Sequence, residues 1–188
     1  MSLMFHSKLR SFGLGIALLA AACVSACSSD GSQSQSSDSL HPDIIREGTT
    51  TSPALNEFLG IAPDDWGWAG GQFQAPMDMD VLPAATPETF TWQADPTAPP
   101  GANDVLDPSK QQGQVFLLIF SAPSSDAALL RVFTSLTSYT PDADAWQKLV
   151  AAGSQSITLS VTSGTFENDQ LTSDGGPHAG QVIHFTIQ

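Results

Sequence analysis

The sequence predicts a mainly β protein, an antiparallel two-sheet sandwich with one short inserted helix near residues 141–152. Apolar and polar residues alternate over residues 89–93, 157–162 and 182–187, with the period of a half-buried strand. Residues 115–120 are continuously apolar, as in a central strand that is covered on both faces. Segments rich in turn-forming residues separate these runs at the spacing of sandwich strands.

Residues 53–85 are predicted to form an N-terminal extension that packs on the sandwich. Ser52 is a suitable N-cap and Pro53 fits the first position of a short helix, which Gly60 ends. Residues 73–82 are expected to hold one irregular edge strand. Whether this extension belongs to the sandwich itself stays open from sequence alone.

Residues 86–188 are assigned to the sandwich domain. Its first regular strand, residues 89–93, places two aromatic residues on one face, and Trp92 is therefore expected in the core. A long loop rich in proline, glycine, aspartate and asparagine occupies residues 95–112. Residues 129–133 predict a further strand after the continuous apolar run.

The alternation of apolar and polar residues is interrupted near residues 141–152, and this segment predicts the inserted helix. Thr140 can cap a helix and Pro141 fits its first turn, where the acidic residues that follow are favoured by the helix dipole. Trp146 begins an apolar stripe at helical spacing, and Gly153 ends the segment. We expect Trp146 to pack this helix across one end of the sheets.

The predicted sandwich resembles fibronectin type III-like and immunoglobulin-like modules of bacterial surface lipoproteins. The resemblance rests on Pro87, Phe90 and Trp92 in the second strand, on residues 114–120 as the third, on residues 137–140 closing the fifth, and on residues 157–161 and 182–187 as the last two. It covers just over half of the chain. It implies a shape more than an activity, because this fold carries many unrelated functions.

The N-terminal segment resembles a bacterial lipoprotein signal. Lys8 and Arg10 precede an uncharged apolar run over residues 12–24, which has the length of a signal-peptide core and is shorter than the roughly 20 residues that span a membrane. Small residues then lead to Cys27. The resemblance implies that residues 1–26 are a signal peptide and that Cys27 is lipidated, with palmitate among its acyl chains, before it becomes the first mature residue.

Three alternatives to this interpretation stay open. The segment can be an ordinary signal peptide that leaves Cys27 as a free thiol, an uncleaved anchor helix, or a signal acylated at Cys23. In the favoured interpretation the acyl chains hold the protein in a membrane, and residues 27–52 form the lipidated cysteine and a disordered, serine-rich tether. The serine after Cys27 favours the outer over the inner membrane of a bacterial cell envelope, by analogy with lipoprotein sorting.

The charge balance and the cysteine count exclude several classes of protein. The 188 residues include 19 acidic and 6 basic side chains, for a formal net charge of −13, so a basic surface for nucleic acid is excluded. The 2 cysteines cannot build a disulfide framework. We predict no metal and no cofactor. Loop acids such as Asp95, Asp104 and Asp107 are expected on a solvated surface, and a calcium site is the alternative.

The sequence predicts no catalytic residues. It contains no G-x-S-x-G motif, His178 lies in a glycine-rich segment where an exposed turn is expected, and His184 is expected to face outward on the last strand. The protein is therefore predicted not to be an enzyme. The alternative is a small envelope hydrolase, an esterase, peptidase or glycosidase, that uses acids in the loops 95–112 and 164–180.

Two tryptophans among glycines are the predicted ligand-binding residues. Trp66 and Trp68 alternate with Gly67 and precede two further glycines, so their rings can stack on a sugar or on an apolar patch of a partner. Burial of both rings against an open sheet edge is the other interpretation, and it is the one that we favour. The predicted function is a lipid-anchored envelope protein that presents a binding or structural module to an unidentified envelope protein or glycan.

Overall fold

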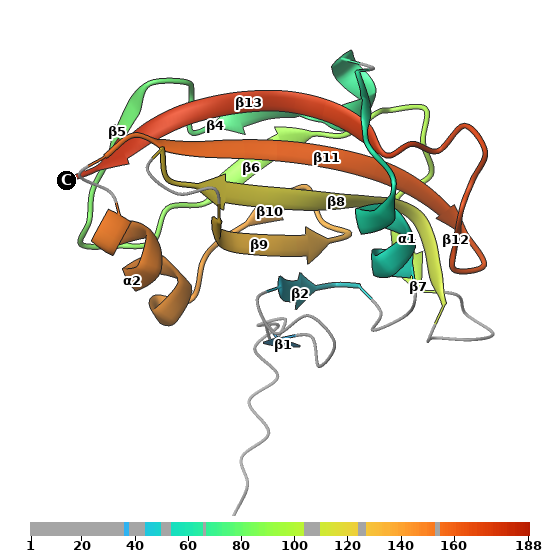
Figure 1. Cartoon of the computed structure of the whole chain (residues 1–188), viewed down its shortest axis with the longest axis horizontal. Coiled ribbons are helices and arrows are strands. Elements are labelled where there is room, and N and C mark those ends of the chain that lie inside the picture. The colour runs from blue at the N-terminus through green and yellow to red at the C-terminus, as the bar shows by residue number, and fades with distance from the viewer. Residues whose placement is uncertain are drawn as a thin grey trace, which may run out of the picture. The chain divides into compact units, whose positions relative to one another are not determined.

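The structure is a computed structural model that describes residues 36–37, 44–49, 54–65, 67–103, 110–123, 127–152 and 155–188. All of these residues lie within the unit Gln33–Gln188, and the unit Met1–Ser32 lies outside them. The described chain is mainly β and forms two sheets, with a sandwich-like arrangement (Figure 1). The predicted fold class is confirmed at this level.

The larger sheet, sheet A, is built on four long strands that neighbour one another in an antiparallel order. They are β9 (Ala128–Thr134), β8 (Gln111–Ser121), β11 (Ile157–Glu167) and β13 (His178–Ile187). β1 (Ser36–Ser37) and β2 (Ile44–Glu47) extend the sheet beyond β9, while β3 (Asp64–Asp65) and β5 (Asp80–Leu82) pair with β13. β7 (Ala102–Asn103) pairs with β8, and β12 (Gln170–Leu171) pairs with β11.

Sheet A is mixed, whereas the sequence predicted an antiparallel sandwich. β2 runs parallel to β9, and β3 and β5 run parallel to β13. These short strands come from early parts of the chain and join the sheet without a hairpin, as parallel pairing requires. The strands whose patterns were visible in the sequence are the antiparallel ones.

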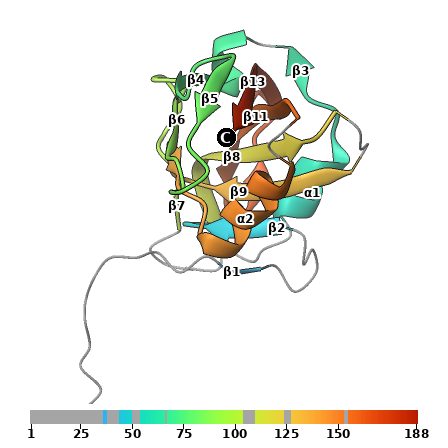
Figure 2. The ribbon, with the colours of Figure 1, turned by 90° about the vertical axis from the view of Figure 1, so that its left-hand side faces the viewer.

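The smaller sheet, sheet B, covers one face of sheet A. It has the antiparallel order β10 (Ser138–Tyr139), β6 (Phe90–Gln93) and β4 (Gln72–Ala75). Figure 2 shows β4 and β6 in one layer beside the long strands of sheet A. The prediction of one edge strand over residues 73–82 is wrong, because this segment forms β4 in sheet B and β5 in sheet A. Part of the predicted extension is therefore integral to the sandwich.

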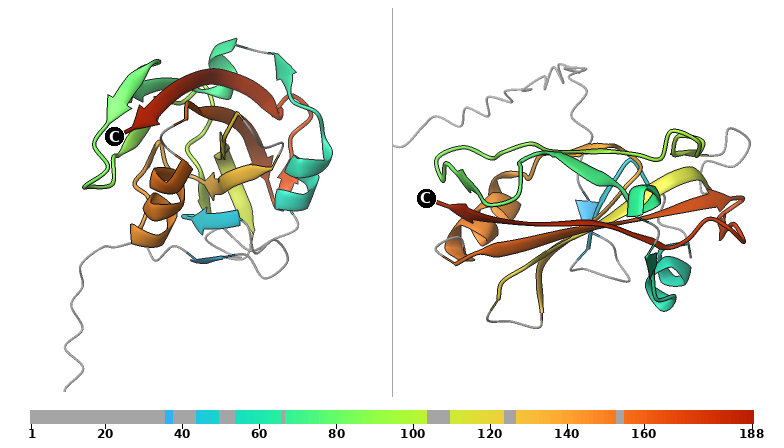
Figure 3. Two further views of the ribbon diagram at one scale, coloured as in Figure 1. Left: turned by 60° about the vertical axis from the view of Figure 1, so that its left-hand side comes forward. Right: turned by 90° about the horizontal axis from the view of Figure 1, so that it is seen from above.

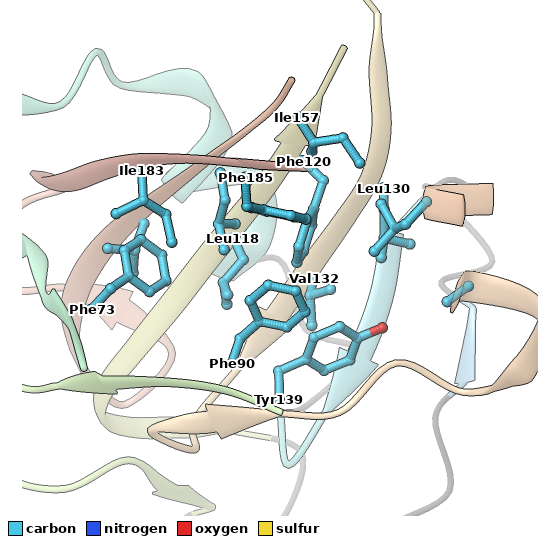
Figure 4. Packing of buried hydrophobic residues seen from close by; sticks show 14 of the residues in the cluster. Phe73, Phe90, Leu118, Phe120, Leu130, Val132, Tyr139, Ile157, Ile183 and Phe185 are labelled. Atoms are coloured by element: carbon cyan, nitrogen blue, oxygen red, sulfur yellow. The ribbon is translucent and has the colours of Figure 1, made fainter. Parts of the chain in front are cut away.

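Aromatic rings fill the space between the sheets (Figure 4). The Phe90 ring centroid lies 5.1 Å from that of Phe120, and the Trp92 ring centroid lies 5.5 Å from that of Phe116, both with edge-to-face geometry. Such pairs contribute about 0.5–1.5 kcal/mol each beyond the area that they bury. Trp92 is 2% exposed, so its predicted place in the core is confirmed.

The outer face of sheet A carries a second apolar cluster. α1 (Ala54–Gly60) lies over it and inserts Phe58, whose ring centroid is 5.7 Å from that of Phe133 and 6.1 Å from that of Phe166. Val115 and Leu117 of β8 belong to the same cluster. β8 is therefore covered on both faces, as its continuous apolar run predicted.

The inserted helix is confirmed as α2 (Ala143–Ala152). Asp142, rather than the predicted Thr140, caps it, since its Oδ1 accepts a hydrogen bond of 2.8 Å from the main-chain N–H of Ala145. Trp146 is 2% exposed, and its indole N–H donates a hydrogen bond of 3.0 Å to the main-chain oxygen of Ala84. Figure 3 shows α2 beside the C-terminal end of β13 and α1 toward the other end of the sheet.

The predicted tether is wrong over residues 44–47, which form β2. Ile44 is fully buried in the outer cluster, and the Arg46 guanidinium carbon lies 5.4 Å from the ring centroid of Phe133. The cation–π contact and the main-chain pairing with β9 offset the conformational entropy that this short segment loses when it becomes ordered. Cys27 and most of the predicted tether lie outside the described residues.

Candidate functional site

The inner face of sheet A changes from apolar to polar toward the end that carries β7 and β12. On β8 the inward apolar row ends at Phe116, and Gln114 occupies its next position. On β11 the row ends at Val161 and continues with Ser163 and Thr165. Thr165 is paired directly with Gln114, so both side chains lie on the same inner face.

His178 reaches this polar end from β13 through a change of register. Ser160 pairs with Val182, but Thr162 pairs with Ala179, so one residue of β13 is bulged out between these pairs. The bulge reverses the alternation and turns His178, the partner of Ser163, toward the inner face. His178 is 8% exposed.

The prediction that His178 is an exposed turn residue is therefore wrong. The glycine-rich segment ends at Pro177, and His178 is already the first residue of β13. His184, beyond the bulge, faces outward as predicted, with 46% of its side chain exposed. Its Nδ1 lies 3.2 Å from Oδ1 of Asp78, whose pKa is lowered mainly by the hydrogen bond from the His184 main-chain N–H.

A cavity of about 210 Å³ lies over the polar end of sheet A. Its walls on sheet A are Gln114, Thr165 and His178, and two loops close it from the other side. One loop follows β6 and contributes Asp95, and the other follows β12 and contributes Asp174. We refer to this space as the end cavity.

A second cavity of about 190 Å³ adjoins the end cavity. Asp95, Ala98 and Gln114 line both spaces. The second cavity reaches the aromatic core at Phe116, and Pro100 of the loop after β6 contributes a further apolar wall. The two together form a site with a polar part and a more apolar part.

The first loop holds the Asp95 carboxylate in a fixed orientation. Its Oδ1 accepts hydrogen bonds from the main-chain N–H of Thr97 at 2.8 Å and from the Thr97 hydroxyl at 2.7 Å. This is an Asx turn, closed by a bond from the Ala98 N–H to the Asp95 main-chain oxygen. The main-chain N–H of Gln114 donates to the Pro99 oxygen at 2.8 Å and ties the loop to β8.

The same bonds determine the charge of Asp95. The hydroxyl and the N–H of Thr97 stabilise the carboxylate and lower the pKa of Asp95 below its usual value. Partial burial acts in the opposite direction, and electrostatic attraction to His178 adds a smaller lowering. Asp95 is therefore ionised at neutral pH.

The second loop is held by main-chain hydrogen bonds to β11. Thr165 donates to the Gly175 oxygen at 2.7 Å and accepts from the Thr172 N–H at 2.9 Å. Nε2 of His178 lies 3.2 Å from the main-chain oxygen of Asp174, and because a carbonyl oxygen only accepts, this nitrogen is the donor. A side chain at Gly175 would place its Cβ 2.1 Å from the Thr172 hydroxyl, so the loop requires glycine there.

The remaining wall of the end cavity is Ala69, in the 3₁₀ helix η1 (Gly67–Gly70). The hydroxyl of Ser163 donates a hydrogen bond to the Ala69 main-chain oxygen. Gly70 and Gly180 allow η1 to lie directly on β13, because a Cβ on Gly70 would come within 2.0 Å of the Gly180 nitrogen. η1 is thereby fixed on the sheet.

The predicted site residues lie mostly outside what the structure describes. Trp66 and Cys27 fall outside the described residues, so the aromatic ligand site and the lipidation stay predictions. Trp68 lies in η1, immediately before the cavity residue Ala69, and its side chain is outside the description. Over the ranges that the structure covers, no helix is long and apolar enough to cross a membrane.

The two acid loops were predicted from the sequence, whereas the strand residues between them were not. The available signal was Gln114, a polar residue at an inward position just before the apolar run of β8. Across the described segments, no group of three or more histidine, cysteine or acidic side chains is arranged to hold a metal ion. Comparison of the chain with protein-family models, curated proteins and solved structures found no match.

Proposed function

We propose that this protein is a lipid-anchored cell-envelope module that binds an envelope partner and does not catalyse a reaction. The observation that carries the proposal is the ionised, rigidly held carboxylate of Asp95 in the end cavity. A carboxyl group that serves as a general acid or base near neutral pH works best with a pKa raised toward 7. The pKa of Asp95 is lowered, which suits the recognition of a charge and not the transfer of a proton.

The contacts of His178 support the same conclusion. A catalytic histidine directs one ring nitrogen at a nucleophile and the other at an orienting carboxylate. Nε2 of His178 instead donates to the main-chain oxygen of Asp174 and thereby holds the loop. The ring is a wall of a binding site whose loops are tied to rigid strands.

The anchor is the part of the proposal that depends on the signal sequence. The apolar run, the small residues before Cys27 and the polar segment after it support acylation at Cys27 and an outer-membrane location. Metabolic labelling with palmitate tests it: Cys27→Ser is expected to lose the label, and the matched control Cys23→Ser to keep it. Label retained on Cys27→Ser contradicts the anchor.

Membership of the sandwich in the fibronectin type III-like or immunoglobulin-like class is part of the proposal. Two facing sheets and a buried Trp92 on the second sheet support it. The parallel strands β2, β3 and β5 are the departure from that pattern. An experimental structure whose strand connections follow a different order would overturn this assignment while leaving the binding function intact.

A small envelope hydrolase is the second candidate, because the two predicted acid loops meet around one cavity with His178. The test is to incubate the full-length protein in detergent with envelope glycan and protein fractions and to follow retention and product formation together. We expect saturable retention without product. Product whose formation is abolished by Asp95→Asn would replace the binding function by the hydrolase.

A further inference from the structure

We infer that the end cavity and the adjoining cavity bind an alkyl-linked organic cation, an ammonium or guanidinium group of the kind that a lysine or arginine side chain carries. The inference rests on the proposed binding function and names the ligand chemistry of that site. It follows from the charge, the free acceptor atoms and the shape of the site.

The charge of the end cavity is negative. Asp95 and Asp174 approach it from opposite loops, and the described lining residues include neither lysine nor arginine. His178 is the basic group that faces these acids, and its Nε2 is directed at the Asp174 main-chain oxygen. The formal net charge of −13 on the whole chain adds an attractive field for a cationic ligand.

The acceptor atoms are placed before any ligand arrives. Both hydrogen bonds from Thr97 end on Oδ1 of Asp95, which leaves Oδ2 to accept from a ligand. Gln114 is 4% exposed and points from the inner face of β8 into the space that it shares with Asp95, where its carboxamide oxygen is a second acceptor. The Thr165 hydroxyl is a third.

The shape of the site favours an organic cation. The end cavity, about 210 Å³, is large enough for a guanidinium or ammonium group with several waters, since each water occupies roughly 30 Å³. The adjoining cavity offers apolar walls at Phe116 and Pro100 for an alkyl stem. A bare metal ion would use neither the apolar walls nor the available volume.

Ligand-observed NMR titration of the full-length protein in detergent micelles tests the inference. The probes are n-butylammonium, n-butylguanidinium and the neutral n-butanol, followed by the capped tripeptides Gly-Lys-Gly and Gly-norleucine-Gly. Saturable binding of the cations, at least tenfold weaker binding of the neutral probes and weakening by salt are expected. Equal binding of butanol and butylammonium, or saturation by neither cation, would overturn the inference.

The peptide titrations distinguish the two sources of the cation. Tighter binding of the lysine peptide than of butylammonium assigns the site to a basic side chain of a protein partner. Equal affinity of the two supports recognition of free alkylamines.

Isosteric variants locate the binding. Asp95→Asn retains the Thr97 hydrogen bonds to an amide oxygen, so the loop is expected to stay folded while cation affinity falls roughly tenfold or more. Asp174→Asn, in the other loop, is the second variant. Asp144→Asn changes the net charge equally but lies in the first turn of α2, which precedes β11, whereas the cavity is near the end of that strand. It is expected to change affinity less than twofold.

The variants also separate this inference from the proposed function. Unchanged cation affinity in both Asp95→Asn and Asp174→Asn would overturn the cavity assignment. Retention of envelope partners equal to that of the native protein would in that case preserve the binding function. Loss of a product-forming activity in Asp95→Asn would overturn the proposed function instead.

Discussion

Two buried tryptophans differ in one hydrogen bond, and this difference predicts unequal effects of the same substitution. Trp92 and Trp146 are each 2% exposed. Within the described chain the indole N–H of Trp92 has no hydrogen-bond partner, whereas that of Trp146 donates to the main-chain oxygen of Ala84 at 3.0 Å. Replacement by phenylalanine removes the N–H from both sites.

At Trp92 the replacement removes a polar group whose burial is uncompensated, a cost of about 1–3 kcal/mol in the native protein. Most edge-to-face contact with Phe73 and Phe116 is retained by a phenylalanine ring. The lost ring volume costs a similar amount, about 24 cal/mol per Å³ of residual cavity. Trp92→Phe is therefore expected to change the free energy of unfolding by no more than about 1 kcal/mol.

At Trp146 the same volume is lost, and the Ala84 oxygen also loses its hydrogen bond. Trp146→Phe is expected to be more destabilising than Trp92→Phe by about 1–3 kcal/mol. Urea unfolding followed by far-ultraviolet circular dichroism measures the difference. Equal costs, or a larger cost at Trp92, would refute the assignment of the two indole environments. Trp92→Ala, which also removes the ring contacts, is expected to cost about 3–5 kcal/mol.

Further predictions concern a half-buried acid, a loop glycine and the outer helix. Burial raises the pKa of Glu47 above 4.5, so folding favours the protonated carboxyl group. The stability that this preference contributes is present below pH 4.5 and is lost as the pH rises through the pKa of Glu47 in the folded protein. Glu47→Gln is expected to raise the urea midpoint at pH 7 more than at pH 4, and an equal gain at both pH values would contradict this. Gly175→Ala is expected to lower the free energy of unfolding by about 1–3 kcal/mol, measured by thermal unfolding, because its Cβ would lie 2.1 Å from the Thr172 hydroxyl oxygen. Gly60→Ala, which meets nothing within 4 Å, is the neutral control, and similar losses in both variants would contradict the loop geometry. Phe58→Ala is expected to cost about 3–5 kcal/mol in urea unfolding, and a loss under 1 kcal/mol would show that α1 does not stabilise sheet A.

The long strands and the helix were predictable because their signals are local. Alternation of apolar and polar residues indicates β6, β11 and the C-terminal half of β13. A capping residue, a proline and an apolar stripe indicate α2. The continuous apolar run of β8 indicated cover on both faces, which α1 and sheet B supply. In each case one segment of about ten residues contains the whole pattern.

The short parallel strands were not predictable for the opposite reason. β2, β3 and β5 contain two to four residues each, and they are stabilised by partners far away in the sequence. Ile44 and Arg46 are buried only because Phe133 and its neighbours are already in place on β9. A polar composition therefore indicated a tether where the fold provides a strand.

The amino-acid sequence by itself determined the mainly β class, the position of α2, the core tryptophans and the acidity of the loops, since these depend on neighbouring residues or on composition. Only the tertiary structure decided that Asp95, Gln114 and His178 line one cavity. A single bulge near Ser160 reverses the alternation of β13 and turns His178 inward. Such a bulge is a property of the pairing between two strands, so the sequence of either strand alone does not predict it.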